Sequence, residues 1–280
     1  MRRVWRMSEP RLGLGIGWRP ELALLCERRT DLGFVEITVE NFEDRAPLPR
    51  SLRRLQERGV VVIPHGISLS LGGAERVDQA RVDRFARMAE QCGAPLASEH
   101  IAFVRAGGVE IGHLTPIPRT RASVDAVVTN VRRVRETLGV PLALENIAAM
   151  FEWPDAEMDE SEFVRTILDE SGAMLLVDVS NLHANARNLG ADTAGLIAGL
   201  PLERIAYCHV GGGAERDGIY MDTHTDPVPA AAIALLRQLV TVARPPGAML
   251  ERDGNFPPDA DTNRELDAIR GALEGHESVA

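Results

Sequence analysis

Several histidines and carboxylates of this chain stand where short apolar segments end. His65, His100 and His209 each close such a segment, and Glu145 and Glu251 close two others. Imidazole and carboxylate donors suit iron, manganese or zinc. A carboxylate among several imidazoles can also bridge two ions about 3.5–4 Å apart. These residue types therefore predict a site that holds more than one metal ion.

The apolar segments that end in these residues are the strands of a predicted α/β fold. Each is short and is followed by a segment with helical periodicity. We interpret the alternation as a (β/α)8 TIM barrel, whose strands all point their C-terminal ends to one mouth. An open, doubly wound sheet gives a similar alternation, but eight units favour the barrel. The predicted strands cover residues 12–16, 34–39, 60–64, 96–100, 142–145, 174–179, 205–210 and 248–251.

The segments between the strands complete this pattern. Helical periodicity covers residues 20–29, 48–57, 75–91, 120–138, 159–170, 192–198, 229–243 and 262–273. The longest irregular stretches follow strands and would lie over the active face; they cover residues 105–118, 149–158, 211–228 and 252–261. Gly13, Gly15 and Gly17 lack the GxGxxG spacing of a nucleotide-binding loop, and we interpret them as a tight first turn.

Charge and composition limit the classes of function. The chain has 280 residues and a formal net charge of −10, which argues against a broad nucleic-acid surface. Its three cysteines are too few and too far apart for a disulfide framework, which fits a reducing cytoplasm. No segment resembles a signal peptide or a membrane span. We expect a cytoplasmic protein with no nucleic-acid or membrane partner, a flexible tail over residues 1–10 and one catalytic domain over residues 11–280.

Seven consecutive predicted strands end in polar residues, which is unusual for a barrel rim. A single such residue is usually only a satisfied polar group. Many carboxylates in one cavity repel one another and are costly to desolvate, so cations must lie among them. The loops supply further donors. Asp222 and His224 lie two residues apart after the seventh strand, and Asp178 is followed by Asn181 and His183.

These residues lie in motifs that follow one another along the chain. The motifs are PHGISLS at residues 64–70, SEH at 98–100, LENI at 144–147, VDVSNL at 177–182, HVGG at 209–212, DTH at 222–224 and LERD at 250–253. Together they resemble the multinuclear non-heme iron-dependent oxidases. This family includes the oxidase of methanobactin biosynthesis and relatives that modify ribosomally made peptides. The resemblance runs, in order, from about residue 12 to residue 273.

The resemblance implies a fold, a cofactor and a substrate. The fold would be a TIM barrel of the xylose-isomerase-like type, holding two or three iron ions as Fe2+ or Fe3+. O2 would be the co-substrate, and the reaction would oxidise a side chain, commonly cysteine, of a ribosomal precursor peptide in natural product biosynthesis. Such a peptide is often presented by a separate recognition protein, which we expect as a further partner.

The same resemblance assigns roles to individual residues. The ligands of the principal iron pair would be His65, His100, Glu145, Asp178, His209 and Glu251, and among these we expect Glu145, Asp178 and His209 to be catalytic. The third ion or its surroundings would involve Asn146, Asn181, Asp222 and His224. The chain departs from the family at Gly213, where many members have a second histidine, and at Asn181, where some have a histidine. His183, two residues further on, is either a substitute ligand or a rim residue.

Two other classes of function fit a mouth rich in histidine and carboxylate. One is a divalent-metal hydrolase or isomerase on a similar barrel, such as the trinuclear zinc endonucleases or the sugar isomerases. The acidic net charge weakens the nuclease, and the ordered motifs weaken the isomerase. The other is a protein that stores or senses metal without turnover.

Overall fold

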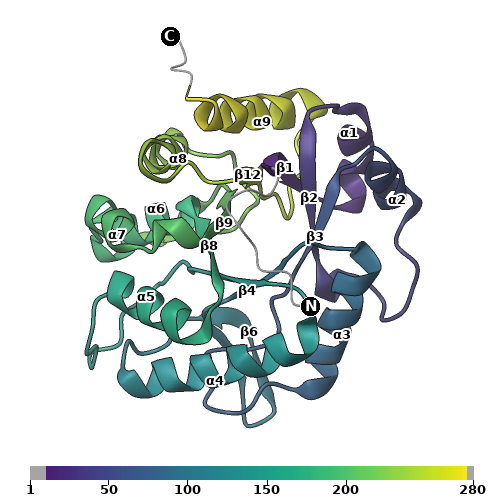
Figure 1. The fold of residues 1–280 in the computed structure, drawn as a ribbon. Helices are drawn as coiled ribbons and strands as arrows, with labels where there is room; N and C mark the ends of the chain where they lie inside the picture. Colours follow the sequence, from purple (N-terminus) through teal and green to yellow (C-terminus); the bar gives the residue numbers. More distant parts are fainter. Residues whose placement is uncertain (1–10, 276–280) are drawn as a thin grey trace.

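Eight parallel strands close into one barrel in the computed structural model, which describes residues 11–275 (Figure 1). The helices form a ring around the strands. The (β/α)8 barrel predicted from the sequence is therefore confirmed. The strand order around the barrel is β1, β12, β9, β8, β7, β4, β3, β2. The tail expected over residues 1–10 lies outside the described residues.

The barrel strands begin and end within two residues of the predicted positions. They are β1 (Gly13–Gly17), β2 (Leu32–Thr38), β3 (Val61–His65), β4 (Ala97–His100), β7 (Leu142–Glu145), β8 (Met174–Asp178), β9 (Ile205–Val210) and β12 (Gly247–Leu250). The helices are α1 (Ala23–Arg28), α2 (Arg50–Glu57), α3 (Gln79–Cys92), α4 (Arg121–Leu138), α5 (Glu160–Ser171), α6 (Val179–Leu189), α7 (Thr193–Gly199), α8 (Ala230–Ala243) and α9 (Asp259–Leu273). Within residues 11–275, no helix combines the length and apolar character needed to cross a bilayer.

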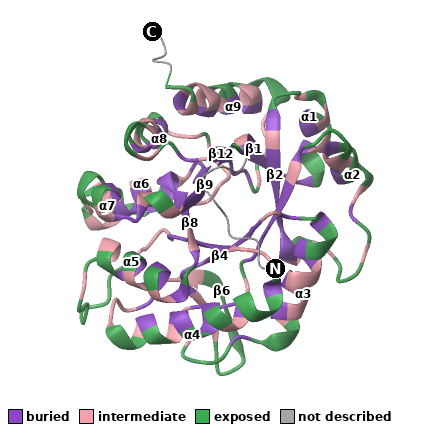
Figure 2. Ribbon diagram, viewed as in Figure 1, coloured by how far each residue is buried: buried purple, intermediate pink, exposed green. Residues whose placement is uncertain are grey.

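Apolar side chains fill both sides of the barrel wall. A larger cluster joins the strands to the helices, whose buried residues face inward in Figure 2. A smaller, fully buried cluster lies inside the barrel and includes Phe34, Ile63, Leu96, Leu176 and Met249. Side chains two positions apart in a strand point the same way. A polar layer therefore stands above this apolar layer, formed by Glu36, His65, Ser98, Asp178 and Glu251.

Gly15 lies within β1, and not in the tight turn predicted for the glycine run. A Cβ atom at this position would lie 2.4 Å from the ring of Phe34. The missing side chain therefore leaves the space in which this ring fills the barrel interior.

Helix α6 begins directly after β8, where no helix was predicted before residue 192. Asp178 makes this possible, because its Oδ1 accepts hydrogen bonds from the backbone N–H groups of Ser180 and Asn181 at 2.6 and 3.1 Å. This is an N-cap, and it satisfies orphan donors of the first turn. The helix predicted over residues 192–198 is present as α7.

Two stretches expected to be irregular contain β-hairpins. One hairpin pairs β5 (Phe103–Ala106) with β6 (Val109–Thr115), and the other pairs β10 (Ala214–Arg216) with β11 (Ile219–Met221). Both stand at the mouth of the barrel, where their residues line one cavity. The prediction that these stretches lie over the active face was right, but their internal structure was missed.

Candidate metal centre

The pairing register of the strands sets histidines and carboxylates side by side at the mouth. His100 lies opposite Glu145 across the β4–β7 pair, and Asp178 lies opposite His209 across the β8–β9 pair. Glu251 follows the last residue of β12. All five side chains are buried, so their charges interact at short range with little screening by solvent.

Glu145 lies between two groups of ligands and turns one carboxylate oxygen toward each. Its Oε2 is 3.5 Å from Nε2 of His65 and 3.3 Å from Nε2 of His100. Its Oε1 is 3.4 Å from Nδ1 of His209. That nitrogen is also 3.0 Å from Oε2 of Glu251. A carboxylate in this position is suited to bridge two cations.

A third ligand group consists of Asp178, Asp222 and His224. It shares Asp178 with the group of Glu145, His209 and Glu251, and His224 also lies near Glu251. Nε2 of His224 is 2.7 Å from Oδ2 of Asp222 and 3.9 Å from Oδ2 of Asp178, and its Nδ1 is 3.5 Å from Oε1 of Glu251. His224 has a φ of 50°, in the left-handed region that non-glycine residues rarely adopt. Its ring packs against Gly211, where a Cβ would lie only 2.7 Å away. The loop thus holds this imidazole at a cost in backbone energy, as often occurs at functional sites.

Gly213 marks one of the departures from the family pattern. A Cβ atom there would lie 2.3 Å from the carbonyl oxygen of Met221, in the hairpin that folds over this position. A histidine side chain would not fit without movement of that backbone. In the part of the chain that the structure describes, His224 is therefore the one imidazole of the third group, beside Asp178 and Asp222.

Several buried polar atoms in these groups have no hydrogen-bond partner within residues 11–275. They are Glu145 Oε2, Asp178 Oδ2, His209 Nδ1, Asp222 Oδ1, His224 Nε2 and Glu251 Oε2, and Oδ1 of the neighbouring Asn181 is unpaired as well. Leaving such an atom unpaired costs about 1–3 kcal/mol, and more when the group is charged. Cations among these atoms would remove that cost, and the nitrogen and oxygen donors fit iron, manganese or zinc. The residues present therefore fit a metal centre.

The crowding of charge shifts the acid–base equilibria of the centre. Burial raises the pKa of Asp178 above its usual range, and the carboxylates of Asp222 and Glu145 raise it further. Burial acts to lower the pKa of His100, but the carboxylates of Glu145 and Glu99 outweigh it and raise this pKa to about 9. Protons therefore neutralise part of the negative charge in the metal-free protein, and bound cations would displace them.

The three cysteines do not contribute ligands. All of them are buried and free. Burial raises the pKa of Cys26 and of Cys92 to about 12, so both stay protonated at neutral pH. No ligand group within residues 11–275 includes a cysteine, so the ligand set of the mouth is nitrogen and oxygen only.

Three of the predicted ligands have other surroundings. Both side-chain atoms of Asn146 bind the backbone of Asp178: Nδ2 donates to the carbonyl oxygen at 3.0 Å, and Oδ1 accepts from the N–H at 2.9 Å. Asn181 lines the mouth cavity and donates through Nδ2 to the carbonyl oxygen of Asn146 at 2.9 Å. His183 lies outside the ligand groups, with its ring edge-on against Tyr220 at 5.0 Å. The structure brings together the other eight: His65, His100, Glu145, Asp178, His209, Asp222, His224 and Glu251.

Glu36 is a buried carboxylate beside the ligands that was missing from the predicted site. Its Oε2 lies 2.8 Å from Nε2 of His209 and accepts a hydrogen bond from the hydroxyl of Tyr207 at 2.5 Å. The prediction covered polar residues at strand ends only, whereas Glu36 lies in the middle of β2. The signal was an acid within an apolar strand, two residues after Phe34 and on the same face.

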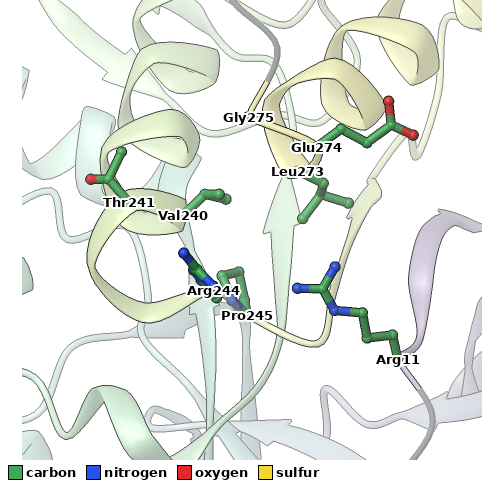
Figure 3. Close-up of a pocket in the computed structure, with 8 residues that line it drawn as sticks. All are labelled: Arg11, Val240, Thr241, Arg244, Pro245, Leu273, Glu274 and Gly275. Atoms are coloured by element: carbon green, nitrogen blue, oxygen red, sulfur yellow. The ribbon is translucent and has the colours of Figure 1, made fainter.

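The ligand groups form the floor of a cavity of about 900 Å³ at the mouth of the barrel. Glu110 and His113 of β6 and Phe256 line its walls. This volume suits a small molecule or a short peptide segment. A second cavity, of about 440 Å³, lies at the opposite end of the barrel between α8 and α9 (Figure 3). It is lined by Arg11 and Arg244 among others and contains none of the ligand groups, so the mouth is the candidate site.

Comparison with known sequences places the whole barrel in one family. The family model described as RiPP precursor modification enzyme MbnB/TglH/ChrH matches residues 13–274. A UPF0276 protein of Streptomyces avermitilis is 50% identical over 270 residues, which cover 94% of this chain and 55% of that relative. A UPF0276 protein of Chromobacterium violaceum is 34% identical over 262 residues, 93% of this chain and 95% of that relative. The chain thus spans about half the length of the first relative and nearly all of the second.

Solved structures share the fold at low sequence identity. L-ribulose 3-epimerase has a TM-score of 0.57 at 15% identity, with 95% of this chain and 92% of that chain covered. A xylose isomerase domain protein from Planctomyces limnophilus has a TM-score of 0.57 at 12% identity, with 95% of each chain covered. The barrel is therefore of the xylose-isomerase-like type, as predicted, and at these identities the likeness concerns the fold alone.

Proposed function

Because the chain belongs to the family of RiPP precursor modification enzymes, which act on ribosomally made peptides, we propose that it is an iron-dependent oxidase of such a peptide. It uses O2 to oxidise a side chain of the precursor, and we assign cysteine as that side chain. The observation that carries this proposal is Glu145, a buried carboxylate with one oxygen toward each of two adjoining ligand groups.

We assign the ions to the three groups as follows. His65, His100 and Glu145 hold one iron, and Glu145, Asp178, His209 and Glu251 hold the second. Asp178, Asp222 and His224 hold a third. Iron bound there would supply one-electron redox chemistry for the reaction with O2. Glu145, Asp178 and His209 belong to the group that joins the others, and we propose them as catalytic.

The chain's own residues bind the peptide and limit access of water. His65, His100, Glu145 and Glu251 are buried and line the mouth cavity, so a reacting side chain must enter through this cavity. A volume of about 900 Å³ admits a few residues of an extended peptide, and not a folded domain. A separate recognition protein would therefore present the precursor from outside the mouth. We place the reaction in the cytoplasm, where the substrate thiol stays reduced.

One experiment separates this proposal from its alternatives. The protein is purified without oxygen, its metals are quantified, and it is mixed with a cysteine-containing precursor peptide and O2. We expect bound iron, a charge-transfer band when the peptide thiol is added, and O2 uptake that matches a mass change in the peptide. Stoichiometric zinc with turnover in the absence of O2 would instead favour the hydrolase or isomerase. Bound metal with neither O2 uptake nor a mass change would favour metal storage.

A further inference from the structure

A continuous line of hydrogen bonds runs beneath the ligand groups and joins two of the histidines. Nδ1 of His65 lies 2.8 Å from Oγ of Ser98, and that hydroxyl lies 2.7 Å from the hydroxyl of Tyr207. Tyr207 lies 2.5 Å from Oε2 of Glu36, which also lies 2.8 Å from Nε2 of His209. The line crosses from β3 through β4, β9 and β2, so only the closed barrel assembles it.

The line is shielded from solvent along its whole length. Each of its five residues is at most 2% exposed. Below it lies the apolar cluster inside the barrel, where the ring of Phe34 meets that of Tyr207 edge-on at 5.5 Å. The polar atoms of the line therefore have one another as hydrogen-bond partners. Breaking one of these hydrogen bonds would leave a buried polar group unpaired.

The positions of the protons follow from one end of the line. Tyr207 donates its hydroxyl proton to Oε2 of Glu36, and in its ionised form this carboxylate also accepts from Nε2 of His209. The hydroxyl of Tyr207 has a single proton, already directed to Glu36, so Tyr207 must accept from Ser98. The proton of Ser98 is then committed in turn, and its Oγ must accept from Nδ1 of His65. When cations are bound, the second nitrogen of each imidazole, Nε2 of His65 and Nδ1 of His209, is the one that would present its lone pair to them.

We propose that Glu36, Tyr207 and Ser98 are positioning residues that set the tautomers of two metal ligands through this line. These second nitrogens are the ones that face Glu145. Nε2 of His65 lies 3.5 Å from its Oε2, and Nδ1 of His209 lies 3.4 Å from its Oε1. The carboxylate of Glu36 thus sets the tautomer of one imidazole in each of the two ligand groups that share Glu145. A hydrogen-bond acceptor behind a ligating imidazole fixes its orientation and raises its basicity. This inference rests on the metal centre of the proposed function and adds residues outside the ligand set.

The test measures tautomers and cation affinity, and not turnover. Protein labelled with 15N-histidine is compared with its Tyr207→Phe variant by ring 1H–15N correlation spectra in the metal-free state, and both are titrated with Zn2+ against a chelating dye. We expect His65 to carry its proton on Nδ1 in the wild type. In Tyr207→Phe the proton of Ser98 is released from Tyr207, so His65 should become a mixture of tautomers. The affinity for Zn2+ should fall by roughly 10- to 100-fold.

Further variants separate this role from a purely structural one. Ser98→Ala removes the hydroxyl that accepts from Nδ1 of His65, and it alters a smaller side chain than Tyr207→Phe does. If Tyr207→Phe does not fold, Ser98→Ala should show the same mixture of His65 tautomers and the same loss of Zn2+ affinity. Ser171→Ala, at a buried serine outside the line, is the control and should change neither readout. If Zn2+ binds the wild type and both line variants equally, the inference is wrong while the metal centre stands. If the wild type binds no Zn2+, both fail. If Glu36→Gln alone loses bound Zn2+, Glu36 is a ligand and the positioning role is wrong.

Discussion

At the scale of single residues, Glu145 is the side chain whose removal should affect the centre most. It belongs to two ligand groups at once, and its two oxygens have different neighbours. Glu145→Gln keeps the shape but removes the charge that both groups share. We expect the variant to lose bound iron and to slow peptide oxidation by more than about 100-fold. Changing a residue that only hydrogen-bonds to a ligand typically costs roughly 10- to 100-fold, and the loss of a shared ligand should cost more. Metal analysis and mass spectrometry of the peptide would measure both effects.

The matched control for this change is Glu136→Gln on the exposed face of α4. It removes the same charge from the same residue type, far from the mouth, and should leave metal content and rate at wild-type values. Circular dichroism of Glu145→Gln should match the wild type, because the barrel core does not depend on this charge. A Glu145→Gln protein that retains all of its iron and its activity would remove Glu145 from the centre.

At the scale of secondary-structure elements, Asp178 performs two separable tasks. Its Oδ1 caps helix α6, and its Oδ2 has no hydrogen bond and faces the ligand groups. Asparagine caps a helix as well as aspartate does, whereas alanine does not. In chelator-treated protein we therefore expect Asp178→Ala to unfold about 1 kcal/mol more easily than Asp178→Asn, while both lose metal affinity. Urea titrations followed by circular dichroism would measure this difference.

Asp159 provides the control for this separation, because it caps α5 but belongs to none of the ligand groups and does not line the mouth cavity. Asp159→Ala should likewise be less stable than Asp159→Asn, but both should bind metal as the wild type does. Equal stability of Asp178→Asn and Asp178→Ala would show that the cap of α6 contributes nothing measurable.

The β5–β6 hairpin presents apolar side chains beside the cavity. Val109 and Ile111 of β6 are 67% and 46% exposed, and the next residues of this strand line the mouth. Exposed apolar groups next to a site often bind a partner or substrate. Replacing both by serine should raise KM for the precursor about tenfold, the equivalent of ~1.4 kcal/mol of lost apolar contact, without changing metal content. Steady-state kinetics with the peptide would measure it.

A double variant on the outer surface controls for the general effect of such changes. Leu24→Ser with Val242→Ser alters two residues that are 63% and 59% exposed, on α1 and near the end of α8. This variant should keep the wild-type KM. The same rise in KM in both double variants would mean that the hairpin has no special part in peptide binding.

The elements of the barrel could be predicted from the sequence because burial on both faces leaves a plain pattern. Central strands such as Ile205–Val210 begin with several apolar residues in a row, and long helices such as Arg121–Leu138 repeat their apolar residues with helical spacing. Helix α6 was missed because Val179–Leu189 contains three asparagines, which are poor helix formers and favour turns. Its start depends on the cap from Asp178 and its packing depends on the barrel, and neither is visible in local periodicity.

The candidate site was predictable to the extent that its residues end strands. His65, His100 and Asp178 could be found because parallel strands bring their C-terminal ends together. Glu36 and Tyr207 could not be found by this rule, because they lie deeper inside the barrel and meet only across its interior. The place of His183 depended on the direction of a helix that was itself not predicted.

At the scale of the whole molecule, the barrel interior is arranged in layers. An apolar layer with Phe34 and Met249 supports a polar layer, in which Glu36 and Ser98 lie among ligands such as His65, and the mouth cavity lies above. Each layer draws on strands that are distant in sequence. Cations held by ligands from several of these strands should therefore stabilise the fold, because they bind the assembled barrel and not the unfolded chain.

Bound cations should accordingly stabilise the entire barrel. A ligand at about 100 times its Kd contributes roughly 2.7 kcal/mol to the free energy of unfolding, which in a chain of this size corresponds to about 5–10 °C in Tm. We expect anaerobic Fe2+ to raise the Tm of chelator-treated protein by this amount. Mg2+ at the same concentration should raise it far less, since it prefers sites made of oxygen alone. The rise with Fe2+ should be smaller in Glu145→Gln than in the wild type. Differential scanning calorimetry would measure these shifts, and equal shifts with Fe2+ and Mg2+, or in both proteins, would place the bound cations outside the mouth.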